Sequence, residues 1–239
     1  MIEAGLEFRS EAFDQALAAF LSLPPGLAPA HFTSDEREPE SESNSLANPE
    51  KFLVFVSNSK SGFFLKGAGL TYSIRLVAEK AAICDCFLDV EPRLAVEFLA
   101  HMAGADPAFG FACLPEERER RNRVILRFGV NTIESWVGRD ARRYIPGLYW
   151  LTLLPQALAE RHAVPLSRLA EAAVEHTRLG PDQHLFRFYH DPRDWVAHES
   201  EMDGLYALCP GIFDVRKVEP LLSNAKTIIE ATAVLSGWK

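Results

Sequence analysis

The stretch from Tyr144 to Pro155 constrains the fold of this 239-residue chain more than any other. Pro146 and Gly147 form a turn signal, an aromatic and aliphatic run follows, and Pro155 closes that run before a polar, helix-compatible segment. A proline suits the first turn of a helix, where its missing N–H is not needed. The stretch therefore predicts a turn, a buried strand and a helix that begins near Pro155.

Length and composition predict one α+β domain over residues 1–239. Hydrophobic residues make up 48% of the chain and aromatic residues 10%, which is ample for a core and excludes global disorder. Strand signals gather early and helix signals late, without a regular strand–helix alternation. We therefore expect a mainly antiparallel or mixed sheet with helices packed on it and a helix-rich C-terminal part.

Periodicity places the individual elements. Helical spacing of apolar residues predicts helices that begin near Ser10, Pro92, Pro155, Pro165 and Asn224. Short apolar or alternating runs predict strands at Lys51–Val56, Leu70–Ala78, Ile83–Val90, Arg123–Phe128 and His184–Tyr189. Because Lys51–Val56 is a continuous apolar run, that strand is expected to be buried on both faces. The inner face of the tail helix is expected to consist of Ala225, Ile228, Ile229, Thr232 and Ala233.

An acidic segment interrupts the first half of the chain. Residues 27–50 carry few apolar side chains, and Asp35–Ser43 has none. Such a segment cannot offset the entropy of ordering by burial, so we expect a mobile surface loop at about 27–50.

Charge and hydropathy predict a cytoplasmic protein that binds neither membranes nor nucleic acid. The formal net charge of −8 disfavours nonspecific attraction to nucleic acid and to anionic lipid. Met1–Arg9 lacks the basic start of a secretory signal, and acidic residues interrupt its apolar ones. Every apolar run falls short of the roughly 18 residues that a spanning helix needs. A basic protein is the natural electrostatic complement of this chain.

Cysteines and glycine-rich turns give no sign of a cofactor. Cys84 and Cys86 would share one face of a strand with their Cα atoms about 6.5–7 Å apart, at the limit of disulfide reach, so buried free thiols are expected. The turns Ser59–Gly62 and Lys66–Gly69 match neither a phosphate-binding loop nor a dinucleotide fingerprint. We expect no cofactor.

One group of residues allows an enzymatic alternative. If a helix begins near Arg193, Asp194 and His198 lie at i and i+4 on one face, and His190 could supply a third ligand for a metal-assisted hydrolase. The spacing matches no established metal signature. A helix N-terminus with acidic residues at its start and two surface histidines explains the same pattern. We therefore expect no metal site and no enzymatic activity, and keep the hydrolase as the alternative.

Arginines are concentrated between residues 118 and 143. They stand at positions 118, 120, 121, 123, 127, 139, 142 and 143, against three acids. Such a cluster could bind phosphate, RNA or an acidic protein surface, as an oligomeric scaffold or regulator would. Because Glu116, Glu117 and Glu119 adjoin the cluster, we favour a solvated, salt-bridged edge.

The second half of the chain resembles the bacterial type VI immunity family, formerly a domain of unknown function. The resemblance runs from Pro146–Trp150, which matches a GxYW-type strand, through the helical segment after Pro155 to His184–Phe188 and the Asp191–Pro192 turn. It implies a protein that binds and neutralises a toxin. The matching residues look structural, so the resemblance transfers no catalytic residue.

The immunity interpretation leaves the interface to be predicted from charge. A cluster of carboxylates could steer the chain toward a basic effector toxin and occlude its active site. We predict that the partner-binding residues are Asp35, Glu36, Glu38, Glu40 and Glu42. A solubilising insertion without a role is the alternative for this segment. The sequence is compatible with a monomer and with a homodimer.

Overall fold

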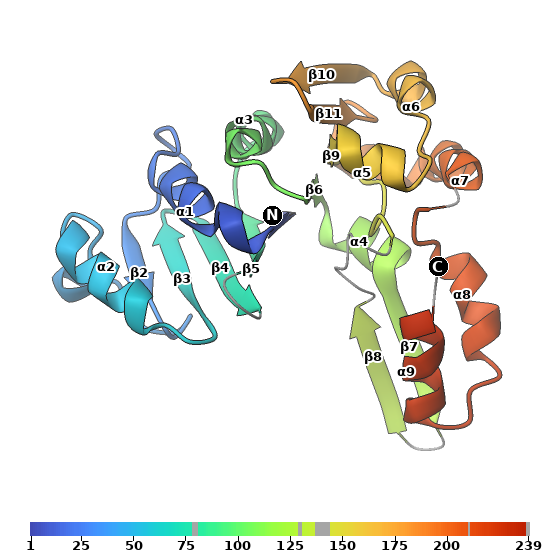
Figure 1. The fold of residues 1–239 in the computed structure, drawn as a ribbon, viewed down its shortest axis with the longest axis horizontal. Coiled ribbons are helices and arrows are strands. Elements are labelled where there is room, and N and C mark those ends of the chain that lie inside the picture. The colour runs from blue at the N-terminus through green and yellow to red at the C-terminus, as the bar shows by residue number, and fades with distance from the viewer. Residues whose placement is uncertain (78–80, 129–130, 137–143, 210, 238–239) are drawn as a thin grey trace.

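A computed structural model describes residues 1–77, 81–128, 131–136, 144–209 and 211–237. It confirms the α+β class, because helices pack on a nine-stranded antiparallel sheet with the order β10-β11-β9-β6-β1-β5-β4-β3-β2 (Figure 1). Its strands are β1 (Ile2–Phe8), β2 (His31–Thr33), β3 (Gly62–Gly67), β4 (Leu70–Val77), β5 (Ala81–Leu88), β6 (Phe109–Cys113), β9 (Leu151–Pro155), β10 (Glu175–Leu179) and β11 (Gln183–Arg187). A separate hairpin joins β7 (Arg123–Phe128) to β8 (Asn131–Trp136).

Nine helices are interspersed with the strands along the described part of the chain. They are α1 (Phe13–Leu21), α2 (Pro49–Asn58), α3 (Pro92–Met102), α4 (Pro115–Asn122), α5 (Gln156–Arg161), α6 (Leu166–Ala172), α7 (Glu199–Leu208), α8 (Val215–Leu222) and α9 (Ile228–Gly237). Short 3-10 helices are η1 (Ser10–Ala12), η2 (Glu42–Asn44), η3 (Ala103–Ala105) and η4 (Pro192–Val196). Figure 1 shows α1 and α3 beside β3–β5, and α5–α7 near β9–β11.

The main core lies between the sheet and the helices α1 and α3. The rings of Phe20, Tyr72 and Phe98, from α1, β4 and α3, meet with centroids 5.3–6.2 Å apart. The Tyr72 hydroxyl donates to the carbonyl of Leu27 at 2.6 Å, which ties the chain after α1 to the sheet. The predicted strand at Ile83–Val90 is confirmed as β5, where Cys84 and Cys86 are buried free thiols.

The predicted strand at Lys51–Val56 is wrong, because these residues form α2. Asn48 caps the helix by accepting from the backbone N–H of Lys51, and Pro49 occupies its first turn. The apolar run is therefore not buried on both faces: Phe52 is 2% exposed, whereas Leu53 and Val54 are 63% and 61% exposed. Cap signals just before the run decided the local structure, and a run of apolar residues alone fits either a strand or a helix.

The segment at about 27–50, predicted to be a mobile surface loop, contains short elements in the structure. The segment holds β2, η2 and the start of α2, and it buries Leu27, Phe32 and Asn44. Within it, Ser41 and Asn44 form a capping box at η2. Residues 34–43 form a continuous exposed run whose end lies in η2, and residues 28, 30 and 47–50 are exposed as well.

The strand and the helix predicted at Tyr144–Pro155 are present in that order, with a later strand start, but Pro146 and Gly147 lie in irregular backbone and not in a turn. Leu148, Tyr149 and Trp150 are buried but precede β9, and the N–H of Tyr149 donates to the Thr152 hydroxyl at 3.0 Å. Trp150 donates its indole N–H to the carbonyl of Tyr189 at 2.8 Å. Pro155 is the last residue of β9 and the N-cap of α5, not a residue of its first turn.

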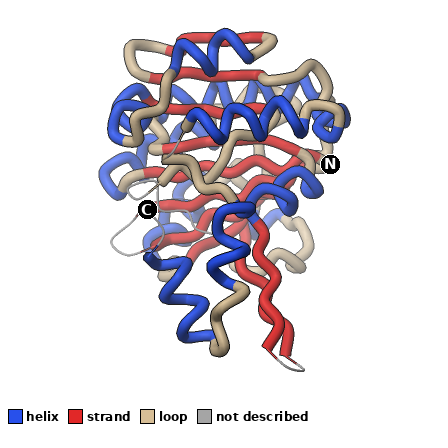
Figure 2. The backbone as a smooth tube through the Cα atoms, turned by 90° about the vertical axis from the view of Figure 1, so that its right-hand side faces the viewer, coloured by secondary structure: helices blue, strands red, loops and turns tan. Residues whose placement is uncertain are grey.

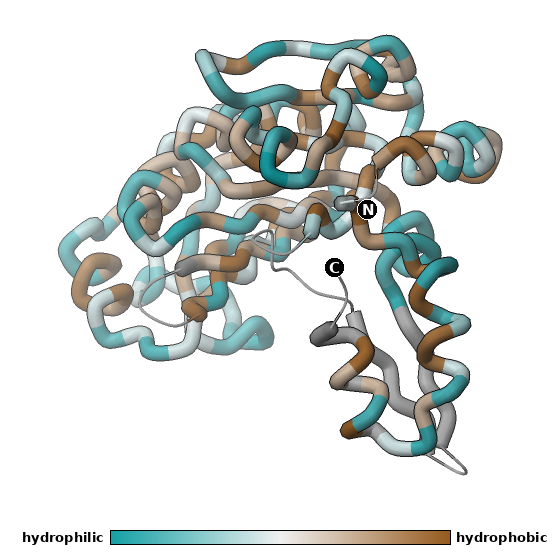
Figure 3. Tube along the Cα trace, turned by 45° about the vertical axis from the view of Figure 1, so that its right-hand side comes forward, coloured by the Kyte–Doolittle hydropathy of each residue, from teal (hydrophilic) through white to brown (hydrophobic). Residues whose placement is uncertain are grey.

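An arm made of β7, β8, α8 and α9 projects from the sheet. Figure 2 shows the hairpin and the two helices extending together at one end of the molecule, and Figure 3 shows the two helices there. The described part of the arm has a hydrophobic cluster of its own, made of Tyr144, Phe213, Val215, Val218, Leu222 and Ala231. The predicted inner stripe of the tail helix is wrong at two positions, since Ile229 is 78% exposed and Ala233 is exposed, whereas Ala231 is buried.

Candidate functional site

The structure does not bring the predicted metal ligands together. His190 and Asp194 are exposed, and the His198 ring instead stacks on Tyr189 with centroids 5.0 Å apart. The Nδ1 atom of His198 lies 3.2 Å from the carboxylate of Glu201. Among the residues that the structure describes, no group of three or more His, Cys, Asp or Glu side chains could hold a metal. The metal-assisted hydrolase built on these residues is therefore not supported by their geometry.

The alternative interpretation of this segment is the one observed. Asp191 caps η4 by accepting from the backbone N–H of Arg193 at 2.9 Å, and its carboxylate also pairs with the Arg193 guanidinium. The hydrogen bonds from Arg193 lower the pKa of the Asp191 carboxyl to about 2. An acidic residue at a helix start is stabilising because it complements the partial positive charge there.

The arginines of α4 and its end are salt-bridged, as predicted, but two of them are not solvated. Arg120 and Arg123, which are more exposed, pair with Glu199 at 2.6 Å and Glu119 at 2.8 Å. The side chains of Arg118 and Arg121 are only 12% and 4% exposed. The side chain of Arg127 lies outside the part of the chain that the structure describes, as do Arg139, Arg142 and Arg143.

Arg121 and Glu117 form a charged pair inside the protein. Glu117 is fully buried, and its Oε1 lies 3.1 Å from Arg121 Nε, one helical turn away. The backbone N–H of Trp150 donates to the other carboxylate oxygen at 3.4 Å. Burial raises the pKa of the Glu117 carboxyl, and Arg121 opposes that rise. The pair attaches α4 to the loop that carries Trp150.

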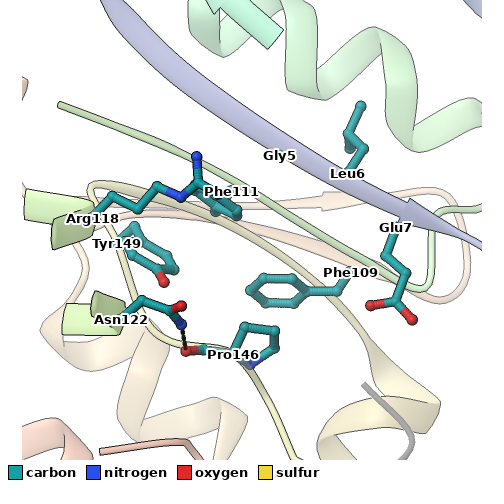
Figure 4. A pocket seen from close by; sticks show the side chains of 9 residues that line it. All are labelled: Gly5, Leu6, Glu7, Phe109, Phe111, Arg118, Asn122, Pro146 and Tyr149. Carbon is teal, nitrogen blue, oxygen red and sulfur yellow. Dashed lines mark hydrogen bonds between the residues drawn. The ribbon is translucent and has the colours of Figure 1, made fainter. Parts of the chain in front are cut away.

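A small aromatic hollow lies beside this pair on the face of the sheet away from α1 and α3. Phe109 and Phe111 of β6, Pro146 and Tyr149 form its walls, and Arg118 of α4 lies at its edge (Figure 4). The Phe111 ring stacks on Tyr149 at 4.5 Å, and the Arg118 guanidinium lies 5.6 Å from the Phe111 centroid. Its volume of about 20 Å³ has room for about one water molecule.

Gly5 makes this aromatic arrangement possible. Gly5 of β1 is paired with Phe111 of β6, and the Phe111 ring lies over it. A Cβ at Gly5 would stand 2.3 Å from Phe111 Cε1. Arg118 bridges the neighbouring strands, because its guanidinium lies 3.0 Å from Glu3 and 3.5 Å from Asp85. The hollow is thus a packed junction between the sheet and α4.

The predicted partner-binding acids lie at the β2 edge of the sheet. All five are exposed, and Lys66 of β3 holds the segment by donating to the backbone carbonyls of Glu36 and Glu38. Glu38 also accepts from the Thr33 hydroxyl, and Glu40 lies 3.4 Å from His31. Among the described residues, no salt bridge involves Glu36 or Glu42. The role of Lys66 could not be foreseen, because it depends on the pairing of β2 with β3.

Comparisons with family models, with curated proteins and with solved structures found no match to the chain. No helix among the described residues combines the length and the apolar character needed to cross a membrane.

Proposed function

We propose that this chain is a cytoplasmic immunity protein that neutralises a cognate antibacterial toxin by forming a stoichiometric complex with it. The proposal joins the resemblance of the second half of the chain to the type VI immunity family with a structural observation on the first half. That observation is the acidic segment, residues 35–42, which stands exposed on one edge of the sheet.

The way this segment is held supports a binding role. Lys66 attaches it through backbone carbonyls, which leaves carboxylates available to a partner. Glu36 and Glu42 are exposed, and the whole chain carries a formal net charge of −8. Carboxylates on a supported segment attract a basic protein over a distance and keep their orientation when it arrives. Toxins that act on nucleic acid present such basic surfaces.

Co-expression tests the proposal. Open reading frames next to the gene in the source genome would be expressed one at a time in a sensitive bacterium, with and without this chain. We expect one of them to arrest growth and this chain to relieve the arrest. Size-exclusion chromatography with light scattering should then show a complex with a fixed ratio of the two proteins. Growth arrest that persists at excess of this chain, for every such reading frame, would contradict the proposal.

A further inference from the structure

Helix α2 directs two apolar side chains into solvent. Its buried side is held by aromatic contacts, since the Phe52 ring lies 5.3 Å from Phe32 of β2 and 6.2 Å from Phe63 of β3. Away from these contacts, Leu53 and Val54 are adjacent and each is more than half exposed. The helix is thus fixed to the sheet while it presents an apolar pair, which is the geometry of a preorganised contact surface.

The acidic segment belongs to the same edge of the sheet. The chain that carries it leaves the end of β2, passes through η2 and reaches Asn48, which caps α2. Phe32 of β2 contacts α2, so the chain before the acidic segment and the chain after it both meet this helix. Figure 1 shows α2 beside β2. The outer edge of β2 is occupied by the chain itself, because His31 forms a bridge with Ser45. An approaching protein therefore meets side chains here, and not an open strand.

We propose that Leu53 and Val54, with Glu36 and Glu42 from the same edge, form the surface that docks the cognate toxin. The matching surface of the toxin carries an apolar patch bordered by lysine or arginine side chains. Apolar anchors at the centre set the lifetime of such a complex, and charges at the rim set its rate of formation. This inference rests on the proposed function and assigns it a surface.

The test uses the purified polypeptide whose growth arrest this chain relieves. The variant L53Q/V54Q keeps helix-compatible residues in α2 and removes the apolar pair. The matched control is V196Q/L208Q, since Val196 and Leu208 are 62% and 56% exposed on η4 and α7. We expect at least tenfold weaker binding for L53Q/V54Q, through faster dissociation, and binding within twofold of the unmodified chain for the control.

A second variant tests the charges. E36Q/E42Q should slow association several-fold at low salt and reduce the dependence of that rate on salt, with little change in dissociation. Circular dichroism would verify that all variants keep their helix content. Unchanged binding of L53Q/V54Q, or an equal loss in the control, would overturn the docking surface and leave the proposed function intact. If L53Q/V54Q instead dissolves a homodimer without affecting toxin binding, a second copy occupies this surface and the inference is wrong. Failure to find any neutralised polypeptide would overturn both.

Discussion

At the scale of single residues, the least expected feature is the charge buried around α4. A sequence with several arginines and glutamates in succession is typical of a solvated helix. Glu117 and Arg121 nevertheless lie inside, with Glu117 near the backbone N–H of Trp150. A buried pair costs desolvation, and removing one partner leaves an uncompensated charge. These residues therefore define the junction between α4 and the Trp150 loop, and they make it sensitive to pH.

Replacing Glu117 by glutamine should change how stability depends on pH. The pKa of the Glu117 carboxyl is raised in the folded protein above its usual 4.5. The folded state then binds this proton more tightly than the unfolded state does, so the contribution of the group is complete below pH 4.5 and is lost as pH rises through the raised pKa. Glutamine does not titrate. The unfolding free energy of E117Q, relative to that of the unmodified chain, should therefore rise with pH. The rise is about 1.4 kcal/mol for each pH unit between 4.5 and the raised pKa.

Urea denaturation at several values between pH 4.5 and 8 measures this difference. At the acidic end of this range the Glu117 carboxyl of the unmodified chain is neutral. There we expect E117Q to be less stable only if the amide makes poorer hydrogen bonds than the neutral carboxyl does. The decisive quantity is the slope of the difference against pH. A flat or falling difference would contradict the raised pKa.

Gly5→Ala should destabilise the sheet at the aromatic hollow. The added methyl would stand 2.3 Å from Phe111 Cε1, so the ring must leave its contact with Tyr149. Overpacking of this kind costs about 1–3 kcal/mol. The matched control is Gly104→Ala, where a Cβ would meet nothing within 4 Å. Thermal unfolding should show a lower midpoint for G5A than for G104A, and G5A/F111L should recover part of the loss. Equal midpoints for both alanine variants would show that the ring moves without cost.

At the scale of elements, α2 shows where local signals and hydrophobic pattern conflict. The run Lys51–Val56 predicts a doubly buried strand, but Asn48 and Pro49 begin a helix just before it. A helix of this composition cannot bury every apolar residue against one side of a sheet, so Leu53 and Val54 remain outside. Strands with clear alternation, such as β4 and β5, could be predicted, because their pattern fits no other element.

Two alanine variants distinguish the observed helix α2 from the doubly buried strand that the sequence predicts for the same residues. Phe52→Ala should cost about 3–5 kcal/mol of unfolding free energy, because it opens a cavity between α2, β2 and β3. Leu53→Ala should change that free energy by less than about 0.5 kcal/mol, because its side chain is mostly in solvent. Denaturant titration of both variants measures the contrast. Large losses for both would mean that this run is buried on two faces after all.

At the scale of the whole molecule, the sequence predicts the fold class better than it predicts the candidate site. The core strands and α3 carry their own periodic signal, and the buried Trp150 follows from its apolar neighbours. The edge of the sheet proposed to bind a partner depends on contacts between distant residues, such as Lys66 with the acidic segment and Phe32 with α2. The arm is also a tertiary feature, because Tyr144 and Phe213 come together from separate parts of the chain. Periodicity within one segment cannot report such contacts.

If the chain works by stoichiometric binding, as proposed, a titration of the toxin with this chain has a sharp end point. The activity of the purified toxin would be measured while increasing amounts of this chain are added, at toxin concentrations well above the dissociation constant. We predict that activity falls linearly and stops falling at a fixed ratio of the two proteins, with the break displaced or blurred for L53Q/V54Q. Complete loss of toxin activity at a small fraction of an equivalent, increasing with time, would show that the chain acts catalytically and would contradict the account.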